Sequence, residues 1–171
     1  MFLYFSRRVG VVQHPWIICR SGHADIPSLS SVADRRNVKP ETQFWQRIRP
    51  RLVKALPAPA HVQRMEPGAS SPGCPDVNIC TGGTEIWIEN KVVAGGNRVR
   101  TLTPAQVAWM SRRATCGGRV WIMCLHAPTD DLLLWPGAQA GKVMDQGLSA
   151  SPSLRLASPW DLGQVATLLL A

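Results

Sequence analysis

The chain has 171 residues, of which 45% are hydrophobic, so it suits one globular domain and is not a chain that is disordered throughout. Its formal net charge is +8 at pH 7, with most of the excess Lys and Arg in residues 1–64 and further basic residues, without acidic ones, in residues 91–119. A balance this basic favours a polyanionic partner, and nucleic acid is the obvious candidate.

The cysteines and the apolar runs argue against a disulfide-stabilised protein and against a membrane-spanning protein. There are 5 cysteines, an odd number at wide spacing, which argues against a disulfide framework and fits a reducing compartment. No apolar run approaches the roughly 18 residues of a membrane span. A zinc module remains a minor alternative, although no Cys-x-x-Cys pair is present; its ligands would be Cys74, Cys80, Cys116 and Cys124.

The first part of the chain predicts little regular structure. Residues 1–39 mix basic, small and turn-forming side chains without a sustained period, so we expect a poorly ordered basic arm. The folded domain is then expected to span residues 40–171.

A helix is predicted over residues 40–56, because apolar side chains recur there every four residues, at Phe44, Ile48, Leu52 and Leu56. Pro50 lies inside this range and predicts a kink or two short helices. Glu41 lies on the apolar side, where a carboxylate needs a partner, although the helix dipole alone also favours an acid in the first turn.

A strand is predicted over residues 61–65, followed by a Gly/Ser/Pro loop over residues 67–72. The next segment indicates a hairpin, with strands at 77–80 and 85–93 joined by the turn Thr-Gly-Gly-Thr at 81–84.

Acidic and basic residues converge in this hairpin. Side chains alternate along a strand, so Glu89 and Lys91 share one face while Asn90 faces the other side. Asp76 precedes the first strand, and pairing of the two strands brings it close to Glu89 and Lys91. Hard divalent ions such as Mg²⁺ are held by one or two carboxylates together with water and phosphate. A neighbouring lysine adds a point charge for a phosphoryl oxygen or an attacking water.

Residues 94–100 contain two glycines together with Arg98 and Arg100. This composition predicts a mobile loop beside the hairpin, of the kind that closes on a nucleic-acid backbone.

Thr103 then begins a helix that ends at Gly117-Gly118. Gln106 completes a capping box with Thr103, which gives it a structural role at the start of this helix. Arg112 and Arg113 are expected to face solvent or DNA.

The rest of the chain predicts strands over residues 120–125 and 130–135 and a short helix over residues 138–147. A loop over residues 149–157 and a last helix over residues 158–170 follow. This order of elements predicts an α/β fold with a mixed central sheet flanked by helices.

Pro75-Asp76, the turn and Glu89-Asn90-Lys91 together resemble the PD-(D/E)xK nuclease superfamily. With Thr-Pro-Ala-Gln at 103–106 and Cys-Gly-Gly at 116–118, the chain is most similar to the VRR-NUC branch of small phage and bacterial nucleases, which are Holliday-junction-resolvase-like. The resemblance covers about residues 40–135.

The resemblance implies a restriction-endonuclease-like core in αβββαβ order and a metal-dependent DNA endonuclease, with junctions or flaps as candidate substrates. Asp76 and Glu89 would hold Mg²⁺ or Mn²⁺ with the backbone carbonyl of Asn90, and Lys91 would position the water or stabilise the developing charge.

The resemblance also implies a third acid, which would be Glu41 or else Glu66, and an accessory contact from Gln106. Phosphates would be gripped by Arg98, Arg100, Arg112 and Arg113. One departure from the family's pattern is Asn90, because this position is usually apolar and a buried amide needs partners.

A non-catalytic nucleic-acid-binding protein on the same fold is the main alternative, because fold and basic charge would suit it equally. A homodimer is a further expectation, since junction cleavage needs two symmetric cuts. The expected location is the cytoplasm, or the host cytoplasm if the chain is phage-encoded.

Overall fold

A computed structural model describes residues 38–65 and 72–171. The arm predicted for residues 1–39 falls almost wholly outside these described residues, and so does Glu66. Residues 37–171 form one compact unit.

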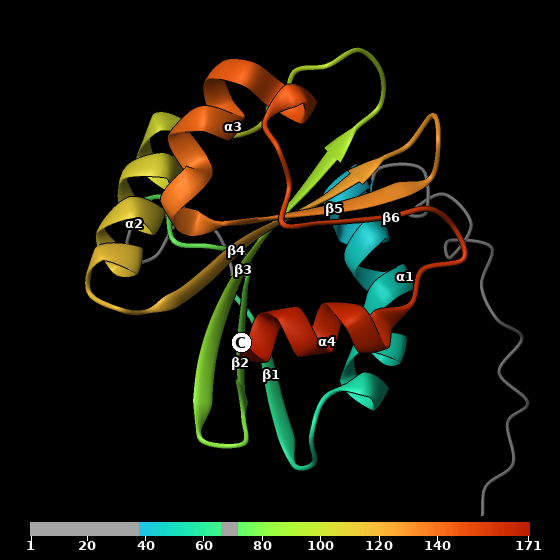
Figure 1. The fold of residues 1–171 in the computed structure, drawn as a ribbon, viewed down its shortest axis with the longest axis vertical. Helices are drawn as coiled ribbons and strands as arrows, with labels where there is room; N and C mark the ends of the chain where they lie inside the picture. Colours follow the sequence, from blue (N-terminus) through green and yellow to red (C-terminus); the bar gives the residue numbers. More distant parts are fainter. Residues whose placement is uncertain (1–37, 66–71) are drawn as a thin grey trace, which may run out of the picture. The chain divides into compact units, whose positions relative to one another are not determined.

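A single mixed sheet organises this unit (Figure 1). Its strands follow one another in sequence order: β1 (Ala60–Arg64), β2 (Val77–Thr81), β3 (Thr84–Val93), β4 (Arg119–His126), β5 (Asp131–Pro136) and β6 (Leu154–Leu156). Neighbouring strands are antiparallel except β3 and β4, which are parallel and are joined through a helix. The predicted α/β fold with a mixed central sheet is confirmed.

Helices cover both faces of the sheet, with α1 and α4 on one side and α2 and α3 on the other (Figure 1). The helical segments are α1 (Pro40–Ala55), α2 (Pro104–Thr115), η3 (Gly137–Gln139), α3 (Ala140–Gln146), η4 (Gly147–Ser149) and α4 (Leu162–Leu170). None of the helices within residues 38–65 and 72–171 is long and apolar enough to cross a membrane.

The central strands serve two cores because their side chains alternate between the faces. On β4, Met123 packs in the core under α1 and α4, and its neighbour Ile122 packs in the core under α2 and α3. Strands buried on both faces form near-continuous apolar runs, as the sequence of β4 and β5 shows. Polar residues on β3 are therefore exceptions that need an explanation.

The structure decides between the alternatives at Pro50 and corrects one sequence prediction. Of the kink or two short helices expected at Pro50, two separate helices are excluded, because one helix, α1, contains Pro50. Pro50 removes one backbone hydrogen bond, but Ile48 and Leu52 on either side are fully buried against the sheet, and this packing favours a continuous helix. The segment predicted as a loop contains β6, whose three residues are too short to show a strand period.

Trp160 joins three parts of the fold. Its indole N–H donates to the carbonyl of Asp130 at 2.7 Å, and its ring packs edge-on against Phe44 in α1. The guanidinium of Arg47 lies 4.2 Å from the Trp160 ring centre and makes two 2.6 Å hydrogen bonds to the Asp130 carboxylate. The cluster links α1, the β4–β5 turn and the segment before α4.

Replacing Trp160 with alanine should therefore destabilise the protein by about 3–5 kcal/mol, the usual cost of removing a buried tryptophan. Arg47→Ala should cost less, about 1–2 kcal/mol, because its pair with Asp130 is half-exposed to solvent and its contact with the Trp160 ring adds about 0.5–1 kcal/mol. Urea unfolding of both variants beside the wild type measures the difference, and equal losses would contradict this ranking.

Candidate active site

The β2–β3 register brings the acidic residues together. Val77 pairs with Ile88, so Asp76, one residue before β2, lies level with Glu89. The Asp76 carboxylate accepts a hydrogen bond from the backbone N–H of Asn90 at 3.0 Å. In a strand the N–H and C=O of one residue point to the same side, so the Asn90 carbonyl faces the side of β3 on which Asp76 lies.

Lys91 is held as a fixed charge next to Glu89. Both side chains are buried, with Glu89 1% and Lys91 4% exposed. The Lys91 ammonium lies 2.8 Å from Glu89 Oε1 and donates to the carbonyl of Thr101 at 2.8 Å and to Gln106 Oε1 at 3.2 Å. Three acceptors converge on it, so the ammonium has little freedom to move.

Gln106 makes hydrogen bonds both at the start of α2 and to Glu89. Its carboxamide oxygen accepts from the backbone N–H of Thr103 at 3.0 Å, and the capping box at the start of α2 is complete. The carboxamide nitrogen donates to Glu89 Oε1 at 2.6 Å. One side chain thus caps α2 and joins the helix to the acidic residues of the hairpin.

The electrostatics of the two carboxylates are unusual. Burial raises the pKa of Glu89 to about 7, although the charge of Lys91 opposes this shift. Burial also raises the pKa of Asp76, against the Asn90 hydrogen bond and the Lys91 charge. Glu89 Oε2 is buried and has no hydrogen-bond partner among the described residues. A buried acceptor without a partner is costly, and a bound cation would supply one.

The oxygen atoms present fit one hard divalent ion. Asp76, Glu89 and the Asn90 carbonyl are hard donors, and Mg²⁺ completes its shell with water. Residues 38–65 and 72–171 contain no cluster of three or more His, Cys, Asp or Glu side chains that could hold a metal. Within these residues the site therefore offers two carboxylates, Asp76 and Glu89.

Glu41 is near this pair but does not join it. It is half-buried in the first turn of α1, and its charge makes a minor contribution to the raised pKa of Asp76 and Glu89. No hydrogen bond connects its side chain to the other acids in the described part of the chain. The rival third acid, Glu66, lies outside the described residues.

Asn90 lies on the opposite face of β3 from Glu89, as strand alternation predicts. Its side chain is 2% exposed, and its Oδ1 has no hydrogen-bond partner in the portions of the chain described here. The buried amide is therefore not explained by a polar contact within the described residues, and its contribution to the site comes from the backbone.

The four arginines named from the sequence lie in different surroundings. Arg98 and Arg100 are exposed on the loop between β3 and α2, the loop whose Thr101 carbonyl holds Lys91. Arg112 is exposed on α2, six residues after Gln106 and thus about 9 Å further along the helix axis. Arg113 is half-buried and bonds to Glu85 at 3.1 Å, so it is less available to a phosphate.

The loop expected to be mobile is hydrogen-bonded to residues 146–149. Asn97 donates from its side chain to the carbonyl of Gln146 at 2.7 Å and accepts at its own carbonyl from the N–H of Leu148 at 2.8 Å. Ser149 donates to Asn97 Oδ1 at 3.2 Å. Sequence reasoning missed Asn97, because an asparagine beside glycines is typical of any turn and its partners are about fifty positions away.

Gly73 allows the segment before Asp76 to pack closely against the start of α2. Its φ is +86°, and a Cβ at this position would collide with the backbone carbonyl of Ala105, next to Gln106. Only glycine permits this close contact between the start of α2 and the segment before β2.

Gly73→Ala should therefore displace the Asp76 segment and destabilise the protein by more than about 1 kcal/mol, because alanine is strained at this φ and its Cβ meets the Ala105 carbonyl. Gly82→Ala is the matched control, since Gly82 also has a positive φ, +55°, but nothing lies within 4 Å of an added Cβ. Urea unfolding of both variants tests this. Equal losses of stability in the two variants would contradict the role given to Gly73.

The cysteines do not form a zinc site in the described residues. Cys124 is buried in the core under α2 and α3, Cys74 is half-buried, and Cys80 and Cys116 are exposed. All four are free thiols, and none of them belongs to a metal-binding cluster in residues 38–65 or 72–171. The zinc alternative is therefore not supported.

No model of a known protein family matches the sequence, and no curated protein matches it. Among solved structures, the chain is similar to Hjc of Archaeoglobus fulgidus, a Holliday junction resolvase from an archaeal hyperthermophile. The two share 17% sequence identity, the match covers 73% of this chain and 98% of that chain, and the TM-score is 0.47. A similarity of this size says nothing about chemistry, so the chemistry of this chain is argued from its own side chains.

Proposed function

We propose that the chain is a metal-dependent endonuclease that hydrolyses phosphodiester bonds in DNA. The observation that carries the proposal is the buried Glu89 carboxylate, whose Oε2 lacks a partner among the described residues while Asp76 and Lys91 lie beside it. Buried acids of raised pKa next to a fixed ammonium are typical of functional sites. The resemblance of the motifs to the VRR-NUC nucleases supports the same chemistry.

Asp76 and Glu89, with the Asn90 carbonyl, are the groups that would hold one Mg²⁺ or Mn²⁺. The ion, when bound, supplies Lewis-acid stabilisation of the phosphate and lowers the pKa of a coordinated water. Gln106 fixes the orientation of Glu89 through its 2.6 Å hydrogen bond. Glu41 would act through its charge from the first turn of α1.

Lys91 is the residue best placed to act on the phosphate or on the attacking water. Its ammonium keeps two acceptors, the Thr101 carbonyl and Gln106 Oε1, even when Glu89 is engaged by a cation. A donor held in place before the reaction stabilises developing charge without reorganising. Lys91 would then donate to a phosphoryl oxygen or orient the water.

The exposed arginines would bind the DNA backbone. Arg98, Arg100 and Arg112 are single positive charges on the surface, which suits phosphate contacts that fix position without reading bases. Arg113 would contribute less, because Glu85 already neutralises it. Selectivity would then come from DNA shape, with junctions or flaps as substrates and two copies of the chain acting on a junction. The four free cysteines suit work in a reducing cytoplasm.

Cleavage of labelled linear, flapped and four-way-junction DNA tests the proposal, with Mg²⁺, Mn²⁺ or EDTA in parallel. Cleavage that requires the metal, and a preference for one DNA structure, are the expected results. DNA binding without cleavage of any substrate would favour the non-catalytic binding protein instead.

A further inference from the structure

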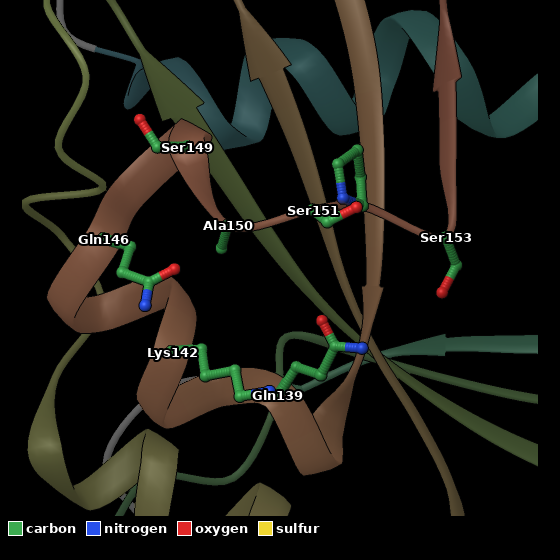
Figure 2. Close-up of a pocket in the computed structure, with 8 residues that line it drawn as sticks. Gln139, Lys142, Gln146, Ser149, Ala150, Ser151 and Ser153 are labelled. Carbon is green, nitrogen blue, oxygen red and sulfur yellow. The ribbon is translucent and has the colours of Figure 1, made fainter.

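An open cavity of about 470 Å³, lined by both polar and apolar surface, lies between α3 and the segment that leads to β6 (Figure 2). One wall carries side chains of the helical segment, and residues 149–153 form the other wall. The lining residues are Gln139, Lys142, Gln146, Ser149, Ala150, Ser151, Pro152 and Ser153. The residues of the active site are not among them.

The lining of this cavity suits an anion. It offers hydroxyls, carboxamides and one ammonium, and no carboxylate. Its volume falls in the range of about 300–1,000 Å³ that small-ligand sites have, but such sites are mostly apolar, and this one is not. Lys142 forms no ion pair with the described residues. Asp145, the acid of α3, is exposed and does not line the cavity.

The cavity is connected to the active site through Asn97. The side chain of Asn97 bonds to the Gln146 carbonyl and to the Ser149 hydroxyl, two residues of the cavity wall. Arg98 follows directly, and its Cα would lie 3.1 Å from a Cβ added at Gly147. The same loop continues to the Thr101 carbonyl that holds Lys91. The loop that carries Arg98 and Arg100 therefore runs from the edge of the cavity to the active site.

We propose that this cavity binds a backbone phosphate of the DNA substrate, away from the bond that is cleaved. Lys142 supplies the charge, and the hydroxyls of Ser151 and Ser153 and the glutamine carboxamides supply neutral hydrogen bonds, while the Ser149 hydroxyl stays with Asn97. The inference rests on the proposed function, because it takes DNA as the ligand. With this contact, the bound DNA strand would reach beyond Arg98 and Arg100 to Lys142.

Lys142→Gln tests the inference, with Lys54→Gln as its matched control. Lys54 is an exposed lysine of α1, on the other face of the sheet. Binding of labelled DNA is followed by fluorescence anisotropy in EDTA, which prevents cleavage, over a range of salt concentrations. Loss of one phosphate contact should reduce the salt slope by about 0.9 and weaken binding about eightfold at 0.1 M salt. The Lys54 variant should match the wild type.

A second variant, Ser151→Asp, adds a carboxylate to the exposed wall of the cavity and should weaken binding at least as much. Stabilisation by Mg²⁺ or Mn²⁺ should stay unchanged in both cavity variants, because neither touches the active site.

Three results would overturn the inference. If Lys142→Gln and Ser151→Asp bind DNA as tightly as the control, the cavity does not contact DNA, and the nuclease proposal is unaffected. Stabilisation by inorganic phosphate that Lys142→Gln abolishes, with DNA binding unchanged, would make the cavity a site for a free anion. A wild type that neither binds nor cleaves DNA would overturn the proposed function as well.

Discussion

Asp76→Asn should abolish the proposed metal-dependent cleavage and leave the fold intact. Asparagine keeps an oxygen that can accept from the N–H of Asn90, but it lacks the negative charge that holds a cation. Burial already raises the pKa of Asp76, so a neutral side chain of the same shape should not destabilise the protein. A bound metal contributes several kcal/mol to such reactions. Loss of about 4 kcal/mol corresponds to about a 10³-fold slower rate.

Initial cleavage rates in Mg²⁺, measured beside the melting temperature, test this expectation. Asp161→Asn is the matched control, because Asp161 caps α4 with its side chain and asparagine is an equally good capping residue. The control should cleave like the wild type. A rate for Asp76→Asn above one-tenth of the wild-type rate would remove Asp76 from the metal site.

Glu89→Gln should stabilise the metal-free protein at pH 8. The pKa of Glu89 is about 7 in the folded protein, against an ordinary value of 4.5. Between these values the folded state binds more protons than the unfolded state, so the free energy of unfolding falls as pH rises from about 4.5 to about 7. The full effect is on the order of 3 kcal/mol and is complete above pH 7. Glutamine resembles the protonated acid and should remove this dependence.

Urea unfolding in EDTA at several values between pH 4.5 and pH 8 measures the effect, with the exposed Glu85→Gln as control. Added Mg²⁺ should then stabilise the wild type, by about 2.7 kcal/mol at one hundred times its Kd, and leave Glu89→Gln unchanged. Parallel pH curves for the wild type and Glu89→Gln would contradict the electrostatic account of Glu89.

The carboxylate pair could be predicted from the sequence because its geometry is local. Asp76 and Glu89 belong to one hairpin, and the turn fixes the register that sets them level. Strand alternation then places Lys91 with Glu89 and sends Asn90 to the other face. The capping box of Gln106 is equally local, since it spans four residues.

The remaining features depend on contacts between distant segments. Asn97 reaches partners about fifty residues away, and Arg113 meets Glu85 across the space between α2 and β3. The residues near Asn97 or Arg113 in the sequence do not include these partners. The sequence therefore predicts a mobile loop at residues 94–100 and an Arg113 that faces solvent or DNA. The continuous α1 is likewise a tertiary effect, because burial on both sides of Pro50 outweighs one lost hydrogen bond.

The parallel pairing of β3 with β4 has a consequence for the order in which the site assembles. Asp76 and Glu89 need only the β2–β3 hairpin, and hairpins close within microseconds. Thr101 and Gln106, which hold Lys91, lie in the crossover to β4, and contacts between distant segments form more slowly. A chain that has formed the hairpin but not the crossover would therefore carry its carboxylates without a fixed lysine, so the proposed hydrolysis would begin only after β4 has paired with β3.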